Sequence, residues 1–154
     1  SSWPIVEYPR IIHEVTGHYP RYVIGMSSHG PDTHFPNYDY AAVTKAVMEV
    51  LVKYLNFHFF DKEVIFNMLR TRTLITDSWL ATAGNDWTSF IERFEIPGTE
   101  VGFNEVAKTA YMLCSGYMDG IRGQTIVADK GYAFSGTLEY VYSQRERLGL
   151  QSHE

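Results

Sequence analysis

The residues best suited to chemistry are Tyr38 and Lys45, which stand seven positions apart at the start of a strongly helical segment. A tyrosine hydroxyl can donate a hydrogen bond to an oxygen on which negative charge develops, and a nearby ammonium group stabilises the same charge. Plainer interpretations remain open. Tyr38 is one of 11 tyrosines, and Lys45 could be a solvated helix residue paired with Glu49, four positions later.

Other reactive side chains carry weaker signals. The six histidines are scattered, and none shows the spacing of a metal site within one helix, so we predict no metal centre. Cys114 is the only cysteine, which excludes an internal disulfide and fits a reducing cytosol. Its apolar helical surroundings predict a buried packing role. Arg70 and Arg72 could contact phosphate or the acidic groups of a carrier protein, or they could be solvated or paired on the surface.

The elements that must position these residues alternate between helix and strand. Hydrophobic periodicity predicts helices within 1–17, over 41–60 and around 106–117, and strands at 22–28, 64–69 and 124–128. Pro9 is expected to kink or break the first helix. Residues 70–101 look irregular, and a polar tail runs from 135 to the end.

This order predicts an α/β fold with a parallel sheet covered on both faces. Three strands make only half of a Rossmann-like doubly wound sheet. The half that normally holds a dinucleotide begins with Gly-x-Gly-x-x-Gly, and that motif is absent here. We therefore expect the carboxyl-terminal half of such a sheet, completed by a separate amino-terminal chain or segment.

Composition excludes several classes of function. Hydrophobic residues make up 45% and charged residues 20%, so the chain can bury a core. The net charge is −5 without a basic cluster, which argues against nucleic acid or anionic membrane as a partner. No apolar run is long enough to span a bilayer. A cytoplasmic protein is expected.

Several short motifs, in order, resemble the carboxyl-terminal half of the short-chain dehydrogenase/reductase superfamily over residues 3–134. They are the strand end Met26-Ser27-Ser28-His29-Gly30, the Tyr38/Lys45 helix, Asn67, the turn Leu74-Ile75-Thr76-Asp77, and Gly123-Gln124 with Asp129 and Gly131. The resemblance implies a catalytic half over 1–134, with a substrate lid at 78–101, and a carboxyl-terminal tail over 135–154.

The tyrosine position narrows the resemblance. Most members carry Tyr-x-x-x-Lys, but Ala41 occupies that tyrosine position here. Tyr38, preceded by Pro36-Asn37, is similar to the tyrosine of the enoyl-acyl-carrier-protein reductases. This implies NADPH- or NADH-dependent reduction of an enoyl thioester of a fatty-acid or polyketide-like substrate. The alternatives are a carbonyl or ketoacyl reductase of the same superfamily, and a non-catalytic binding subunit, which Ala41 and Thr71-Arg72 favour.

The resemblance also implies roles for individual residues. Ser28 stands thirteen positions before Ala41, where the family's active-site serine lies, and Leu74 and Thr76 match positions that meet the nicotinamide amide and the pyrophosphate. The expected sites are catalytic Tyr38, Lys45 and Ser28; cofactor-binding Lys45, Ser27, Leu74 and Thr76; and substrate-binding Tyr40, Trp79 and Trp87.

Partners follow from the missing half. We expect a complementary amino-terminal chain carrying the glycine-rich loop, produced by proteolysis of one precursor just before Ser1. The apolar stripe along 47–55 exceeds what one sheet face requires, so we also expect a two-fold or higher oligomer of paired chains.

Overall fold

The computed structural model describes residues 2–150 of the chain. Its elements run in the predicted alternation of helix and strand. They are α1 (Pro4–Thr16), β1 (Tyr22–Ser27), α2 (Asp39–His58), η1 (Phe60–Lys62), β2 (Ile65–Thr71), α3 (Asp77–Phe94), α4 (Phe103–Cys114), β3 (Thr125–Ala128), η2 (Tyr132–Phe134) and α5 (Thr137–Ser143).

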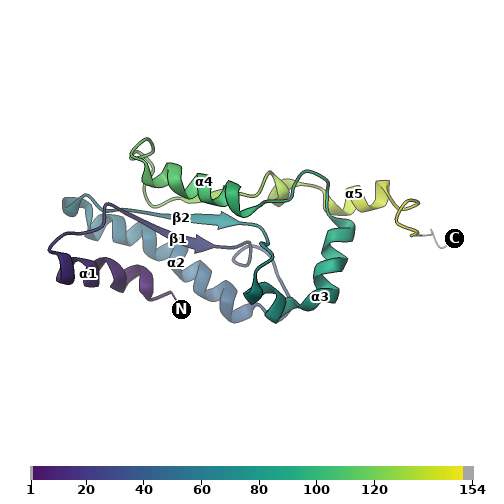
Figure 1. Cartoon of the computed structure of the whole chain (residues 1–154), viewed down its shortest axis with the longest axis horizontal. Helices are drawn as coiled ribbons and strands as arrows, with labels where there is room; N and C mark the ends of the chain where they lie inside the picture. The colour runs from purple at the N-terminus through teal and green to yellow at the C-terminus, as the bar shows by residue number, and fades with distance from the viewer. Residues whose placement is uncertain (1, 151–154) are drawn as a thin grey trace.

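Within residues 2–150 the strands form one three-stranded parallel sheet in the order β1-β2-β3. Tyr22 pairs with Ile65 where β1 meets β2, and Met68 pairs with Thr125 where β2 meets β3. Helices α1 and α2 cover one face of the sheet and α4 covers the other (Figure 1). The α/β fold, the parallel sheet and the helices on both faces are thereby confirmed.

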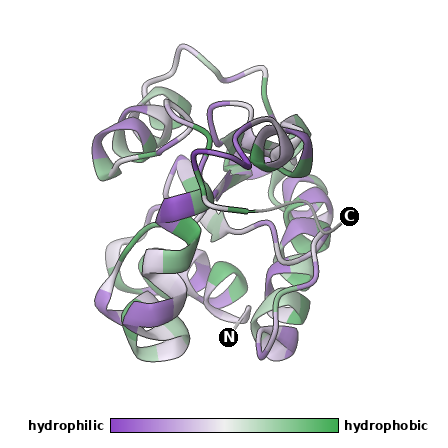
Figure 2. Cartoon of the chain, turned by 90° about the vertical axis from the view of Figure 1, so that its right-hand side faces the viewer, coloured by the Kyte–Doolittle hydropathy of each residue, from purple (hydrophilic) through white to green (hydrophobic). Residues whose placement is uncertain are grey.

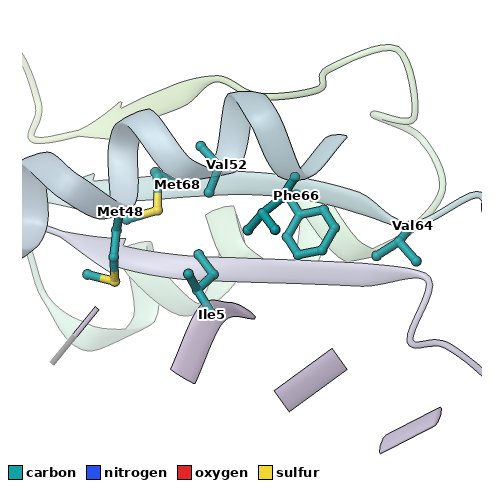
Figure 3. Close-up of a cluster of buried hydrophobic side chains, with 7 residues drawn as sticks. Ile5, Met48, Val52, Val64, Phe66 and Met68 are labelled. Carbon is teal, nitrogen blue, oxygen red and sulfur yellow. The ribbon is translucent and has the colours of Figure 1, made fainter. Parts of the chain in front are cut away.

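The main hydrophobic core lies between the sheet and the α1/α2 layer (Figure 3). Its buried members are Ile5, Met48, Val52, Leu55, Val64, Phe66 and Met68. A smaller cluster of Leu69, Val101 and Val106 lies on the α4 face. β2 is buried at every position, since it is central and covered on both faces. At Gly25 in β1, a Cβ atom would stand 2.4 Å from Sδ of Met68, so glycine permits this close packing.

Two helical predictions were wrong. Helix α1 continues through Pro9, because only one backbone hydrogen bond is lost there and the proline ring is fully buried. Residues 70–101, expected to be irregular, contain the 18-residue helix α3. Gly84, at φ 76°, interrupts its helical geometry and obscured the apolar spacing of Trp87, Ile91 and Phe94.

The buried face of α2 also differs from the predicted one. Met48, Val52 and Leu55 point into the core, whereas Val47 and Val50 of the predicted stripe are 42% and 53% exposed. Helix α2 is therefore apolar on its outer side as well. Figure 2 shows apolar segments on the outer faces of several helices.

The cysteine prediction was wrong too. Cys114 is exposed at the end of α4, whereas the preceding Leu113 is buried. Successive helical residues point about 100° apart, so Cys114 turns away from the sheet when Leu113 faces it. In the tail, Leu148 is buried and its carbonyl accepts a hydrogen bond from Arg93. The domain division at 134/135 stays a prediction, and residues 151–154 of the tail lie outside the described residues.

Candidate functional site

Tyr38 and Ser28 meet at the carboxyl end of β1. Tyr38 immediately precedes α2, and its hydroxyl donates to Oγ of Ser28 over 3.2 Å. The ring of Phe35 meets the Tyr38 ring edge to face, with centroids 6.0 Å apart. On the other side, a Cβ atom at Gly30 would stand 2.7 Å from Cε1 of Tyr38, so only glycine leaves room for the ring in this position. Packing therefore fixes the tyrosine hydroxyl beside the serine.

Lys45 lies two turns further along α2, and its side chain reaches back to β1. Its Nζ donates to the carbonyl oxygen of Met26 over 2.8 Å. Burial lowers the pKa of Lys45 from its ordinary value. The alternative pairing with Glu49 is not what the structure has, because Glu49 binds Arg70 and Ser27 instead. Tyr38, Ser28 and Lys45, the three predicted catalytic residues, thus gather around the end of β1.

A buried network joins the same elements. Arg70, near the end of β2, donates from Nη2 to both carboxylate oxygens of Glu49, over 2.8 and 2.6 Å. Arg70 also pairs with Asp32 in the loop before Tyr38, and the hydroxyl of Ser27 donates to Glu49. Ser27 is 5% exposed and its hydroxyl is engaged in this network. Its cofactor-binding role stays a prediction.

Arg72 forms a second buried cluster just beyond β2. It pairs with Glu95 over 2.5 Å and donates to the carbonyl and hydroxyl oxygens of Thr99 over 2.8 and 2.9 Å. Its guanidinium lies 4.1 Å from the centroid of the Tyr132 ring. Both arginines are paired, as one interpretation expected, but they are buried and do not lie on the surface. Arg72 ties the end of the sheet to the segment that returns from α3.

The predicted nicotinamide-side residues lie on the connection between β2 and α3. Leu74 packs against the core on the α4 face, and the hydroxyl oxygen of Thr76 accepts a hydrogen bond from the backbone N–H of Trp79 at the start of α3. That contact uses the oxygen as an acceptor and leaves the hydroxyl hydrogen able to donate to another group.

The predicted substrate residues are more dispersed. Tyr40 is 92% exposed on the first turn of α2. Trp79 donates from its indole N–H to the hydroxyl of Thr88, and Trp87 stacks on Phe90 with ring centroids 5.5 Å apart. These tryptophans stabilise α3 on either side of its break at Gly84. α3 lies beyond the carboxyl ends of the strands (Figure 1).

A surface pocket of about 250 Å³ lies beside Tyr38. Its lining comes from the loop before α2 and from the first turns of that helix, and includes Gly30, Asp32, His34, Phe35, Asp39 and Ala42. The pocket brings solvent-accessible volume to the Tyr38 ring.

Sequence reasoning missed His29. It is buried directly after β1, and its Nε2 lies 3.4 Å from Oδ2 of Asp129 without a hydrogen-bond partner among the described residues. Burial lowers the pKa of His29, although Asp129 acts in the opposite direction. The position of His29 in the strand-end run Ser27-Ser28-His29 was the available signal. Among residues 2–150, no group of three or more potential ligands is arranged to hold a metal ion.

The arrangement holds a tyrosine O–H donor and a lysine ammonium group at the carboxyl end of a strand in a parallel sheet. In open α/β folds, ligands bind at the carboxyl ends of the strands, because the loops that follow successive strands converge there. Donors fixed before reaction stabilise developing negative charge at little reorganisation cost.

No helix of the described chain is long and apolar enough to cross a membrane.

Comparison with known proteins supports this description. The sequence profile of a family described as Enoyl-(Acyl carrier protein) reductase matches residues 13–133. The enoyl-acyl-carrier-protein reductase (NADH) FabI of Synechocystis sp. is 30% identical over 115 residues, which cover 74% of this chain and 45% of that protein.

Solved structures share the fold. The Bacillus cereus enoyl-acyl carrier protein reductase, solved with NADP+ and indole naphthyridinone, superimposes with a TM-score of 0.72 at 24% identity, covering 87% of this chain and 52% of that one. The Aquifex aeolicus enoyl-acyl-carrier-protein reductase (NADH) superimposes with a TM-score of 0.64 at 23% identity, and the match covers 75% of this chain and 45% of that one. A gluconate 5-dehydrogenase from Burkholderia cenocepacia superimposes with a TM-score of 0.70 at 18% identity, and the match covers 87% of this chain and 52% of that one. The chain thus spans about half the length of the relatives it matches.

Proposed function

The chain belongs to the short-chain dehydrogenase/reductase superfamily, in the family described as enoyl-(acyl carrier protein) reductase, and from this membership we propose that it carries the catalytic half of an NAD(P)H-dependent enoyl-thioester reductase. The observation that carries the proposal is the Tyr38 hydroxyl, 3.2 Å from Ser28 and seven residues before Lys45 on the same helix. The substrate would be a fatty-acyl or polyketide-like enoyl thioester, either free or held on a carrier protein.

Each residue has a defined task in this proposal. Bound NAD(P)H would supply the hydride that adds to the β-carbon of the enoyl thioester. Tyr38 donates a hydrogen bond to the thioester oxygen as negative charge develops there. Lys45 adds positive charge and binds the cofactor ribose. Since Tyr38 has a single hydroxyl hydrogen, that hydrogen would turn from Ser28 to the thioester oxygen, and the Ser28 hydroxyl would then donate to the Tyr38 oxygen and hold it in place. Leu74 and Thr76 would hold the nicotinamide side of the cofactor.

The described residues fit only part of such a cofactor. Lys45 offers an ammonium group at the sheet edge, and Thr76 offers a hydroxyl hydrogen. A glycine-rich turn that would approach the pyrophosphate is absent from the sequence. In this proposal a complementary polypeptide supplies that part of the site.

Reduction assays distinguish the proposal from its alternatives. With the complementary half present, we expect NAD(P)H oxidation with a crotonyl thioester and none with an acetoacetyl thioester. Oxidation with the acetoacetyl thioester alone would support a carbonyl reductase, which the Tyr38–Ser28 pair also favours. If neither thioester is reduced and neither cofactor binds, the chain is a non-catalytic subunit, as Ala41 and the buried Arg72 would suggest.

Lys45→Met is expected to weaken cofactor binding, because the ribose contact and the positive charge are both lost. Lys45→Arg, which keeps the charge, is the control and should retain more affinity. In the wild type, the lowered pKa of Lys45 means that the ammonium group deprotonates at a lower pH than the ordinary 10.5. Cofactor affinity measured by fluorescence titration should therefore fall at high pH in the wild type, but not in Lys45→Met.

We also propose a complementary polypeptide that completes the sheet. One edge of β1 pairs with β2, and its other edge meets no strand within residues 2–150. Most β1 residues are only partly buried, whereas all of β2 is buried. An open parallel edge of this kind is a ready site for another strand.

The partner prediction is tested by intact mass and light scattering of the purified protein. We expect a second polypeptide of comparable size, and a two-fold assembly of such pairs through the outer face of α2. A single pair of chains at micromolar concentration would contradict the two-fold assembly. A monodisperse, folded monomer of 17.7 kDa would contradict both parts.

A further inference from the structure

Arg70 contacts each of the three segments that carry Tyr38, Ser28 and Lys45. It sits opposite Ser27 in the register between β1 and β2. Its guanidinium pairs with Asp32, in the loop that leads to Tyr38, and with Glu49, one turn after Lys45. Ser27, the neighbour of Ser28, donates to the same Glu49 carboxylate.

The burial of this network makes it unusual for a purely stabilising feature. The side chains of Arg70 and Glu49 are 10% and 15% exposed, whereas Asp32 is 66% exposed. Removing an arginine and a carboxylate from water costs much of what their attraction returns, and apolar residues of similar size often stabilise a fold equally well. A bidentate pair does, however, fix geometry, because the planar guanidinium fork matches a carboxylate in one orientation.

We propose that Arg70 is a positioning residue for the reductase site: it sets the loop before Tyr38, the end of β1 and the helix of Lys45 relative to one another. This inference rests on the proposed function. Arg70 acts through Glu49, Ser27 and Asp32. Since Tyr38 and Lys45 must act on the same developing charge, a displacement of one relative to the other costs turnover, and a misplacement of about 1 Å can cost about 10²-fold.

The test separates positioning from stability by removing both charges. Arg70→Met alone leaves Glu49 buried without its partner and risks unfolding. The double variant Arg70→Met with Glu49→Leu replaces the pair by apolar side chains and should keep a urea midpoint close to that of the wild type. The matched control is Arg21→Met with Asp119→Leu, which removes an arginine–carboxylate pair of 2.6 Å next to the amino end of β1, at the opposite end of the strand.

Two readouts are measured on the chain together with its complementary half. Hydrogen exchange of peptides covering 28–38 should be faster in the Arg70/Glu49 double variant and unchanged in the control. The kcat for the crotonyl thioester should fall by about 10²-fold, with a much smaller change in KM. Arg70→Lys keeps the charge but loses the forked guanidinium. Its exchange rate over 28–38 and its kcat should lie between those of the wild type and of the double variant.

The proposal would be overturned if hydrogen exchange over 28–38 were as slow in the double variant as in the wild type. It would also be overturned if exchange became faster while kcat stayed at the wild-type value. If the wild type reduces no thioester, the proposed function fails by itself. The exchange measurement still decides in that case: faster exchange supports the role of Arg70 in holding the loop, and unchanged exchange overturns it.

Discussion

Tyr38→Phe should lower the turnover of a crotonyl thioester by ~10²–10³-fold, which is the usual cost of removing one donor to a developing oxyanion. The substitution deletes only the hydroxyl and keeps the ring, which packs edge to face against Phe35 and closely over Gly30. Loss of activity would therefore report the hydrogen bond and not a change in packing. Steady-state kinetics of the enoyl reduction provide the measurement.

Tyr40→Phe is the matched control, since Tyr40 stands two residues away and is 92% exposed. It should leave turnover nearly unchanged. If Tyr40→Phe abolishes reduction and Tyr38→Phe does not, the enoyl-reductase alignment is wrong and a relocated tyrosine is indicated. Full activity in both variants would mean that neither tyrosine is the donor.

Arg72→Ala should lower the free energy of unfolding by about 3 kcal/mol or more, because it leaves the carboxylate of Glu95 buried without its partner. The side chain of Arg72 is 5% exposed and that of Glu95 is 15% exposed. The substitution also removes two hydrogen bonds to Thr99 and the contact with the Tyr132 ring. Urea denaturation at pH 7.5 measures the loss. Arg21→Ala, which breaks a solvent-exposed pair with Asp119, should cost much less than Arg72→Ala.

The pH dependence of this loss identifies Glu95 as its cause. Burial raises the pKa of Glu95, as do the nearby Glu100 and Glu92, while Arg72 lowers it. A carboxyl with a raised pKa binds more protons in the folded than in the unfolded state, so stability falls as pH rises from about 4.5 through the folded pKa. Without Arg72 this fall should be larger. The penalty of Arg72→Ala should therefore be greater at pH 7.5 than at pH 4.5, and an equal penalty at both would contradict the assignment.

The elements around the site were predictable where a local pattern was uninterrupted. β1 and β2 each contain a short run of mostly apolar residues, and the ends of both strands lie within two residues of the predicted ones. Tyr38 and Lys45 were identified as candidates from their seven-residue spacing together with the resemblance to the enoyl-acyl-carrier-protein reductases, and the structure brings both side chains to the end of β1. The helix α3 was hidden by one glycine, Gly84, whose positive φ interrupts the periodicity that defines a helix.

Long-range contacts account for what sequence did not predict. Arg70 looked like a surface or ligand-binding residue because its partners, Glu49 and Asp32, lie far away along the chain. The outer and inner faces of α2 could not be distinguished, because the helix carries apolar residues on both. Which face meets the sheet is settled by packing between Val52 and the β2 residues, a contact that no local pattern contains.

The register of the sheet also has a kinetic consequence. Tyr22 of β1 pairs with Ile65, and Met68 of β2 pairs with Thr125, so each ladder joins segments that are distant along the chain. Closing such long loops loses chain entropy before any ladder hydrogen bond compensates for it, which makes parallel sheets slow to form. Helix α2 depends only on local hydrogen bonds and can form early. The rate of folding should then be governed by the docking of β2 between α2 and α4.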